Sequence, residues 1–316
     1  MFRDHLWALT AGFLLDCLLG DPEWLYHPVR VIGGFISWVE KHLRARGGDL
    51  RKSAVMLTVS TVLVTMAAVF AVLFPLRLWG RVPWIIGAAL FDWMGLAARS
   101  MVREARGVEE ALGRGVEAAR KQVARIVGRD TARLSEEEII RAAVESVAEN
   151  TTDGVISPMF YAFLGGPVLL WGFKAASTLD SMVGYLNEKY RDIGWSSARL
   201  DDALNFIPAR LTALLMVGAA FLTGADGKNA LRIVRRDHAN HKSPNCAWSE
   251  AAAAGALRIR LGGTHDYFGE PVEKPSIGDD DRPAVRRDIR RANGLLYVSA
   301  ALFLALLCLI GGLFTG

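Results

Sequence analysis

Six apolar stretches limit what this chain of 316 residues can fold into. They are Leu6–Leu19, Ser53–Leu78, Trp84–Ala98, Val155–Phe173, Leu204–Thr223 and Gly294–Phe314. Crossing about 30 Å of hydrocarbon takes about 20 helical residues, and the second and last stretches are long enough. The first and third are short and carry Asp16 and Asp92, so they need help from packing to cross. Because no strand-like alternation is sustained, we predict an all-α fold, a polytopic membrane helical bundle.

The composition indicates a membrane protein with long polar segments. Apolar residues make up 52% of the chain, too many for an ordinary soluble protein, and 22% of the residues are charged. The net charge of +4 suits a face near anionic lipid. No run of Lys and Arg alternates with exposed aromatic residues, as nucleic-acid binding requires. We therefore expect a lipid bilayer as partner and no nucleic acid, in a single membrane-embedded domain of residues 1–316.

Polar segments between the apolar stretches indicate the orientation. Residues 99–130 carry apolar side chains at helical spacing among many Arg and Glu, which predicts an amphipathic helix or pair. Lys and Arg are concentrated in residues 99–141 and 232–291, so both segments should be cytoplasmic. Residues 204–223 would then have to be re-entrant, unless another segment crosses. The expected location is the cell (inner) membrane, crossed several times, with a cytoplasmic active face.

The densest polar cluster opens the stretch ESVAENTTDGVISPMFYAFLGGP, residues 145–167. Ser135 and Glu138 have the spacing of a capping box, and the helix that follows places Glu145 and Glu149 four residues apart. Like charges at that spacing repel by a few tenths of a kcal/mol. A bound cation or cationic substrate would offset the repulsion, and a solvated helix face is the alternative.

The apolar part of the same stretch is interrupted. Residues 150–154, NTTDG, are a turn signal. Gly165-Gly166-Pro167 then divides residues 155–173 into two halves, neither of which can span alone. One solution is a re-entrant helix–turn–helix whose backbone is surrounded by protein or water. A single kinked span is the alternative.

A second polar block, residues 174–211, reads KAASTLDSMVGYLNEKYRDIGWSSARLDDALNFIPARL. Asp201, Asp202 and Asn205 offer oxygen ligands that suit Mg²⁺. The flanking Arg199 and Arg210 are natural bidentate partners for phosphate. A salt bridge between the carboxylates and Arg199 is the alternative.

A third block, residues 237–263, holds side chains of zinc-ligand type. These are His238, His241 and Cys246, but no fourth ligand or standard spacing completes the set. Cys17 and Cys308 show no CxxC spacing with Cys246. We therefore expect neither zinc nor a disulfide. No G-x-x-x-x-G-K-[ST] is present, so a nucleotide would bind without a standard phosphate loop.

Together these blocks resemble the CbiB/CobD family, the adenosylcobinamide-phosphate synthases of cobalamin biosynthesis. Five stretches carry the resemblance, in the family's order: LLDCLLGDPEWLYHPVRVIG, ESVAENTTDGVISPMFYAFLGGP, KAASTLDSMVGYLNEKY, SARLDDALNFIPARLTALL and SPNCAWSEAAAAGALRIRLGG. Residues 53–123 match only in hydropathy, and CAWSE differs in detail from many members.

The resemblance implies an ATP-dependent acid–amine ligase. It would join a propionate carboxylate of adenosylcobyric acid to the amine of (R)-1-amino-2-propanol O-phosphate, or of a related amino-alcohol. The product would be adenosylcobinamide phosphate. The implied cofactors are ATP and Mg²⁺, and the implied partners are the corrinoid substrate and the amino-alcohol phosphate. Other late corrin-pathway membrane enzymes are candidate partners.

That chemistry assigns predicted roles to residues in the matching blocks. A positioned carboxylate base must take a proton from the amine before it attacks. The predicted catalytic residues are Glu145, Glu149, Asp153 and Asp180. The predicted substrate and phosphate ligands are His27, Arg30, Asn150, Lys174, Arg199 and Arg210. The predicted metal ligands are Asp201, Asp202 and Asn205.

Two other function classes compete with the ligase. A membrane phosphotransferase would also use Asp-rich Mg²⁺ sites on helices, but its D-x-x-D-G signature is absent. A corrinoid transporter or scaffold would keep its charges inside the bundle, whereas most charges here lie in long polar segments. Consumption of ATP only in the presence of both substrates would separate the ligase from either alternative.

Overall fold

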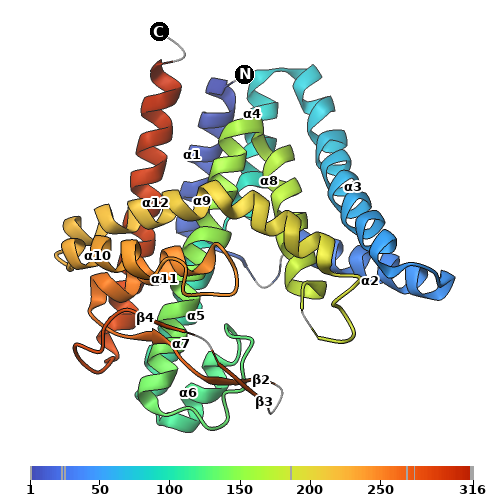
Figure 1. The fold of residues 1–316 in the computed structure, drawn as a ribbon. Helices are drawn as coiled ribbons and strands as arrows, with labels where there is room; N and C mark the ends of the chain where they lie inside the picture. Colours follow the sequence, from blue (N-terminus) through green and yellow to red (C-terminus); the bar gives the residue numbers. More distant parts are fainter. Residues whose placement is uncertain are drawn as a thin grey trace. The chain divides into compact units, whose positions relative to one another are not determined.

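The structure, a computed structural model, describes residues 2–22, 24, 26–185, 187–267, 270–273 and 275–313. Most of these residues are helical and few are in strands, which confirms the predicted all-α fold (Figure 1). The strands among them are two short antiparallel pairs. In one, β1 (Leu261–Gly262) pairs with β4 (Ser276–Ile277); in the other, β2 (His265–Tyr267) pairs with β3 (Glu270–Val272).

The helices are grouped into two compact units, each assembled from separate stretches of the chain. Unit 1 comprises Met1–Ala97, Ser157–Asn205 and Leu307–Gly316, and unit 2 comprises Ala98–Ile156 and Phe206–Leu306. The predicted single domain stays a prediction.

Unit 1 is built on long apolar helices. They are α1 (Phe2–Leu19), α2 (Pro28–Arg46), α3 (Leu50–Trp79), α4 (Arg81–Gly95), α8 (Ser157–Val183) and the first part of α9 (Trp195–Leu222). Asp49 begins α3 by accepting hydrogen bonds from the N–H groups of Arg51 and Lys52. Helix α1 packs on α4, and α8 packs on α1, α3 and α4. The approach of α1 to α4 is close because Gly12 has no side chain: a Cβ there would lie 2.7 Å from that of Asp92.

The predicted interruption of α8 is present. Gly165 (φ −147°, ψ 24°) and Gly166 (φ 66°, ψ −162°) leave helical geometry, and Pro167 follows. Gly166 has the positive φ that favours glycine. A Cβ on this residue would also lie 3.0 Å from Nε2 of His5. The apolar stretch is therefore two helical pieces joined at the glycine pair.

Unit 2 contains several short, polar helices together with long apolar parts of α9 and α12. They are α5 (Ala98–Leu112), α6 (Val116–Val123), α7 (Glu136–Asn150), η1 (Thr151–Ile156), the rest of α9, α10 (Gly227–Asp237), α11 (Cys246–Leu257) and most of α12 (Arg287–Leu313). Helices α5 and α6 form the predicted amphipathic pair. The capping box at the start of α7 is confirmed, because the Ser135 hydroxyl accepts the Glu138 N–H and the Glu138 carboxylate accepts the Ser135 N–H.

The prediction of a turn at residues 150–154 is wrong. The chain continues instead as η1, one turn of π-helix. Thr151 and Thr152 are buried there, and the Thr151 hydroxyl donates to the Val147 carbonyl at 2.8 Å. Buried backbone must keep its hydrogen bonds, so tertiary burial outweighs the local turn preference. Single π-turns inside helices are frequent at functional sites.

Five helical segments of the described chain are long and apolar enough to cross a membrane. They are Leu50–Trp79, Arg81–Leu112, Glu136–Val183, Trp195–Leu222 and Arg287–Leu313. These segments cover five of the six predicted stretches except for two end residues, and they indicate a multi-pass membrane protein. Thr223 follows the end of its segment, and Phe314 lies outside the described residues. The remaining stretch lies in α1, which carries Arg3, Asp4 and Asp16.

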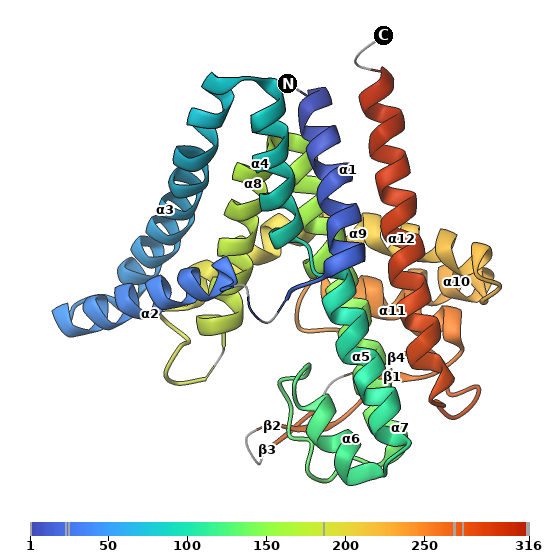
Figure 2. The same cartoon turned by 180° about the vertical axis from the view of Figure 1, so that it is seen from behind.

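Two of these five segments, in α9 and α12, do not run parallel to each other. Within unit 2, the part of α9 from Phe206 onward lies crosswise to α12 in both views (Figures 1 and 2). Two helices so crossed cannot both stand upright in one bilayer. This geometry favours an in-plane or re-entrant course for residues 206–222, which is one of the two solutions that the predicted orientation leaves open.

Candidate functional site

Three carboxylates from α8 and α9 form an acidic cluster in unit 1. Asp201 interacts electrostatically with both Asp180 and Asp202. Its Oδ2 accepts the side-chain N–H of Asn205 at 3.1 Å. Its Oδ1 is buried and has no hydrogen-bond partner among the described residues. Burying a carboxylate oxygen without a partner is costly, so the acidic cluster has capacity for a cation or a proton.

Asn205 holds Asp201 in place rather than offering an open ligand position. Its amide oxygen accepts the buried Ser157 hydroxyl at 2.6 Å, and its amide nitrogen donates to Asp201. One residue earlier, the Leu204 carbonyl accepts the Tyr161 hydroxyl at 2.9 Å. Two side chains of α8 therefore fix this turn of α9.

The acidic cluster fits the Mg²⁺ that the family resemblance implies. Mg²⁺ takes oxygen ligands and usually keeps water and substrate phosphates alongside one or two carboxylates. Asp201 supplies a buried oxygen with no protein partner, and Asp202 is the adjacent carboxylate. Asp180, predicted as catalytic, belongs to the same cluster. The predicted metal ligands are thus brought together, with Asn205 acting as a support.

The other predicted residues of unit 1 are spread over α2, α8 and α9. Arg199 is exposed and Lys174 is half-buried. His27 caps α2: its Nδ1 accepts the Val29 N–H at 3.2 Å, and its Nε2 lies 3.6 Å from Asp21. Arg30 is exposed, and its guanidinium lies 5.1 Å from the ring centre of Tyr26. Their predicted contacts with substrate stay predictions.

In unit 2, Glu145 is a buried and paired carboxylate. It is only 5% exposed, so a solvated helix face is wrong for this residue. The guanidinium of Arg129, itself buried, forms an ion pair with one carboxylate oxygen, and the N–H of Gly262 donates to the other at 2.8 Å. To bind an amine, as predicted, Glu145 would have to leave Arg129.

Glu149 lies in a different environment at the end of α7. It is half-buried, and no Lys or Arg of the described chain lies within ion-pair distance. Its carboxylate meets His241 and Cys246, with one ligand atom of each within 4.8 Å of the others. Burial raises the pKa of Cys246 well above its usual value, and the carboxylates of Glu149, Asp153 and Glu250 add to that rise.

The remaining predicted residues of unit 2 lie on η1, α7 and α9. Asp153 is half-buried on η1, and the side-chain N–H of Asn150 donates to the Ser146 carbonyl at 2.9 Å. The guanidinium of Arg210 lies 3.5 Å from the ring centre of Phe206 and 4.7 Å from that of Trp248. Its Nη1 donates to the Phe206 carbonyl at 2.6 Å and to Oδ1 of Asn245 at 3.5 Å, so the protein already uses part of the guanidinium edge.

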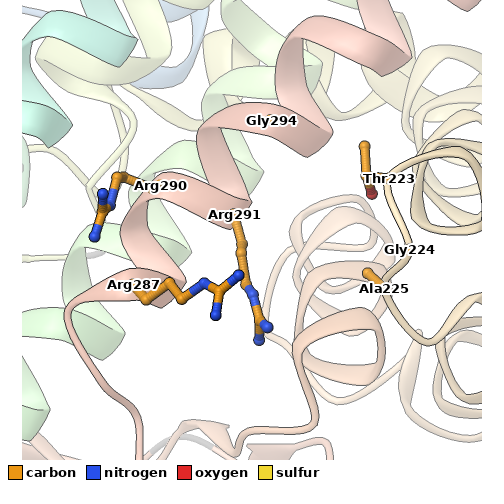
Figure 3. A pocket seen from close by; sticks show the side chains of 7 residues that line it. All are labelled: Thr223, Gly224, Ala225, Arg287, Arg290, Arg291 and Gly294. Atoms are coloured by element: carbon orange, nitrogen blue, oxygen red, sulfur yellow. The ribbon is translucent and has the colours of Figure 1, made fainter.

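A cavity lined by arginine is a feature that the sequence analysis missed. It measures about 680 Å³ and lies between the start of α12 and the turn after α9. Its lining residues are Thr223, Gly224, Ala225, Arg287, Arg290, Arg291 and Gly294 (Figure 3). Arg290 pairs with Glu109 at 2.7 Å, whereas Arg287 has no ion-pair partner in the described chain. The i, i+3, i+4 spacing of the arginines predicts that they share one helix face. No sequence pattern predicts that the turn after α9 lies opposite that face.

The predicted residues are thus divided between the units. Unit 1 contains His27, Arg30, Lys174, Asp180, Arg199, Asp201, Asp202 and Asn205, and unit 2 contains Glu145, Glu149, Asn150, Asp153 and Arg210.

Comparison with known proteins identifies the relatives of this chain. The family model described as CobD/Cbib protein matches residues 9–296. "Cobalamin biosynthesis protein CobD" of Listeria monocytogenes serovar 1/2a is 48% identical over 299 residues, covering 93% of this chain and 94% of the relative. The protein of the same name from Geobacter metallireducens is 49% identical over 300 residues, with coverage of 95% and 94%.

A second name occurs among the relatives. "Cobalamin biosynthesis protein CbiB" of Salmonella typhimurium is 48% identical over 308 residues, covering 95% of each chain. No solved structure matches. The match of the family model over nearly the whole chain confirms the resemblance seen in the five sequence blocks: the chain belongs to the CobD/CbiB family.

Proposed function

We propose that this chain is the ATP-dependent ligase that forms adenosylcobinamide phosphate. Membership of the CobD/CbiB family supports a role in cobalamin biosynthesis, the process for which its relatives are named. The observation that carries the finer proposal is the acidic cluster of unit 1. Its buried, unpartnered Asp201 oxygen suits the Mg²⁺ that ATP chemistry requires.

The proposed reaction makes an amide from a carboxylate, which is a poor electrophile. The propionate oxygen of adenosylcobyric acid attacks the terminal phosphorus of ATP, giving an acyl phosphate and ADP. The neutral amine of the amino-alcohol phosphate then attacks the acyl carbon. The C–O bond to phosphate breaks, inorganic phosphate leaves, and the amine proton passes to a carboxylate base. One ATP is consumed for each amide formed.

The residues of unit 1 serve the phosphate side of this reaction. Asp201 and Asp202 would hold Mg²⁺, which when bound neutralises phosphate charge. Asn205 keeps Asp201 in its orientation through their hydrogen bond. Arg199 and Lys174 donate to phosphate oxygens, Arg199 from an exposed position on α9.

The residues of unit 2 bind the amino-alcohol phosphate, at its ammonium group and at its phosphate. Glu149 has no described cation partner, so its carboxylate is available to bind the ammonium group and take its proton. Asp153 lies one turn further along the chain. Arg287 and Arg291 of the arginine-lined cavity are a second set of donors for phosphate, with Arg287 unpaired in the described chain.

A coupled assay tests the proposal. Purified full-length protein in detergent is supplied with Mg²⁺-ATP, adenosylcobyric acid and (R)-1-amino-2-propanol O-phosphate. ADP and the corrinoid product are then followed together. We expect one ADP per adenosylcobinamide phosphate and no ATP consumption when either substrate is left out. Amide formation without ATP, or corrinoid movement into vesicles without amide formation, would overturn it.

We also propose that the protein lies in the cell (inner) membrane and that its active face is on the cytoplasmic side. The Lys and Arg of residues 99–141 and 232–291 support this orientation. Arg199 and Lys242 are exposed and suit cysteine labelling, in a background where Cys17 and Cys308 are serine. Both positions should resist an impermeant thiol reagent in intact cells and react after lysis. Reaction of either in intact cells would reverse the proposed orientation.

A further inference from the structure

A group of three different ligand types lies in unit 2, outside the acidic cluster of unit 1. Glu149 comes from the end of α7, His241 from the loop between α10 and α11, and Cys246 from the first residue of α11. One ligand atom of each lies within 4.8 Å of the other two. Helices α7 and α11 pack against each other, so packing between distant stretches of the chain creates the group.

We propose that Glu149, His241 and Cys246 form a binding site for a divalent metal ion of the Zn²⁺ class. A thiolate, an imidazole and a carboxylate together are the ligands that zinc takes in proteins. Mg²⁺ prefers oxygen ligands throughout, so this site differs in kind from the acidic cluster. The proposal goes beyond the ligase reaction. A carboxylate held by a metal ion is not free to take a proton, so with metal bound the base proposed for the ligase would be Asp153 rather than Glu149.

The geometry is close to that of a bound ion. Bonds of about 2.0–2.3 Å in a tetrahedral site place ligand atoms roughly 3.3–3.8 Å apart. The three atoms here lie within 4.8 Å of one another, so small side-chain rotations would complete the site. All three side chains are half-buried, which leaves a route for the ion and a fourth position for water or an anion.

The charges around the site favour a cation. Glu149 has no described Lys or Arg within ion-pair distance, and the carboxylates of Asp153 and Glu250 also act on the Cys246 sulfur. The π-turn η1 begins directly after α7, between Glu149 and Asp153. Such turns are frequent at functional sites, and this one sets the direction of the next carboxylate.

Binding requires one hydrogen bond to open, which identifies where the loop must move. Nδ1 of His241 accepts the Ser243 N–H at 2.9 Å, and a neutral imidazole has only one nitrogen lone pair. A metal ion must take that lone pair, so the Ser243 contact opens on binding. Residues 238–245 lie outside the regular helices, and adjustment there disturbs no helix ladder.

Cobalt substitution tests the site directly. Full-length protein in detergent, freed of metal with a chelator and lacking Cys17 and Cys308, is titrated with Co²⁺. We expect one equivalent to bind with a thiolate-to-cobalt absorption band in the near ultraviolet. An equivalent of Zn²⁺ should remove the band, and excess Mg²⁺ should leave it. Neither corrinoid nor ATP is used, so the result is independent of the ligase proposal.

Matched variants identify the ligands. Cys246→Ser should abolish the band, and His241→Gln and Glu149→Gln should each weaken Co²⁺ binding at least tenfold. His238→Asn is the control, because the His238 ring packs against Trp248, with ring centres 4.4 Å apart, and lies outside the group. Size-exclusion elution checks folding, and zinc content by mass spectrometry provides a second measurement on unmodified protein. Absence of the band in the parent protein, or an equal band in Cys246→Ser, would overturn the proposal.

Discussion

Glu145 and Asp201 are buried or half-buried carboxylates on helices of two different units, and their surroundings differ. Glu145 has both oxygens engaged, one by the Arg129 guanidinium and one by the Gly262 N–H. Asp201 has one oxygen on Asn205 and a second oxygen that is buried without a partner in the described chain. Both oxygens of Glu145 therefore have partners within the protein, whereas one oxygen of Asp201 has none in the described chain. We infer that Glu145 mainly stabilises unit 2 and that the acidic cluster of unit 1 awaits a ligand.

The largest expected effect is on stability, at the completed pair. Glu145→Ala removes the carboxylate that pairs with the buried Arg129 guanidinium, and breaking a buried ion pair costs about 3–5 kcal/mol. Unfolding by denaturant in detergent measures the loss. The control is Glu117→Ala, which breaks an ion pair with Arg120 in which the Glu117 side chain is 79% exposed. That change should cost less than about 1 kcal/mol. Similar losses in the two variants would remove the distinction between buried and exposed pairs here.

A smaller effect is expected where a carboxylate lacks a partner. Glu149→Gln should raise the KM for the amino-alcohol phosphate or lower kcat at least tenfold, or about 1.4 kcal/mol. It should leave folding intact, because a half-buried carboxylate-to-amide change costs about 0.5 kcal/mol. Steady-state kinetics at saturating Mg²⁺-ATP measure both constants. A variant with unchanged kinetics would show that Glu149 has no part in handling the amine.

The smallest effect is a pH dependence at a charged network outside the apolar helices. Hydrogen bonds from Arg232 and Arg236 lower the pKa of Asp279. Burial raises the pKa of Asp237, but hydrogen bonds from Arg236 and the Gly278 N–H outweigh it and leave the pKa below its usual value. A lowered folded-state pKa adds stability above the unfolded value, near 3.9, that is lost as the pH falls through the folded one.

Thermal unfolding between pH 6 and pH 3 checks this prediction. The protein should lose stability below about pH 4, and Asp279→Asn should reduce the loss. The effect should stay below about 1 kcal/mol, because the arginine side chains are about half-exposed. An Asp279→Asn protein that loses as much stability in acid as the parent would exclude this network as a source of the pH dependence.

Features that depend on neighbouring residues were predictable from sequence. The Ser135–Glu138 capping box and the break at Gly165-Gly166 need only local geometry, and both are present. The turn predicted at residues 150–154 failed because burial of that segment keeps the backbone helical. Local turn preference is weak against the cost of unpaired buried peptide groups.

The candidate sites were predictable only in part, because their members meet through tertiary packing. Asp201 and Asp202 are adjacent in sequence, so their proximity needed no fold. The partners of Glu145 and Glu149 come from distant segments, and no spacing rule connects them. The prediction of no zinc site counted ligands within one block and therefore missed Glu149. Whether metal binds there stays a proposal.

The Mg²⁺ dependence of ligase activity tests the role of the acidic cluster most directly. Asp201→Asn and Asp202→Asn proteins are assayed over a range of Mg²⁺ at fixed ATP. The control is Asp192→Asn, because the Asp192 side chain in unit 1 is 39% exposed and lies 3.4 Å from Arg51. The half-saturating Mg²⁺ concentration should rise at least tenfold in Asp201→Asn and stay unchanged in the control. Corrinoid binding should be largely preserved in Asp201→Asn and Asp202→Asn. Parental Mg²⁺ dependence and rate in Asp201→Asn and Asp202→Asn alike would contradict a metal site at this cluster.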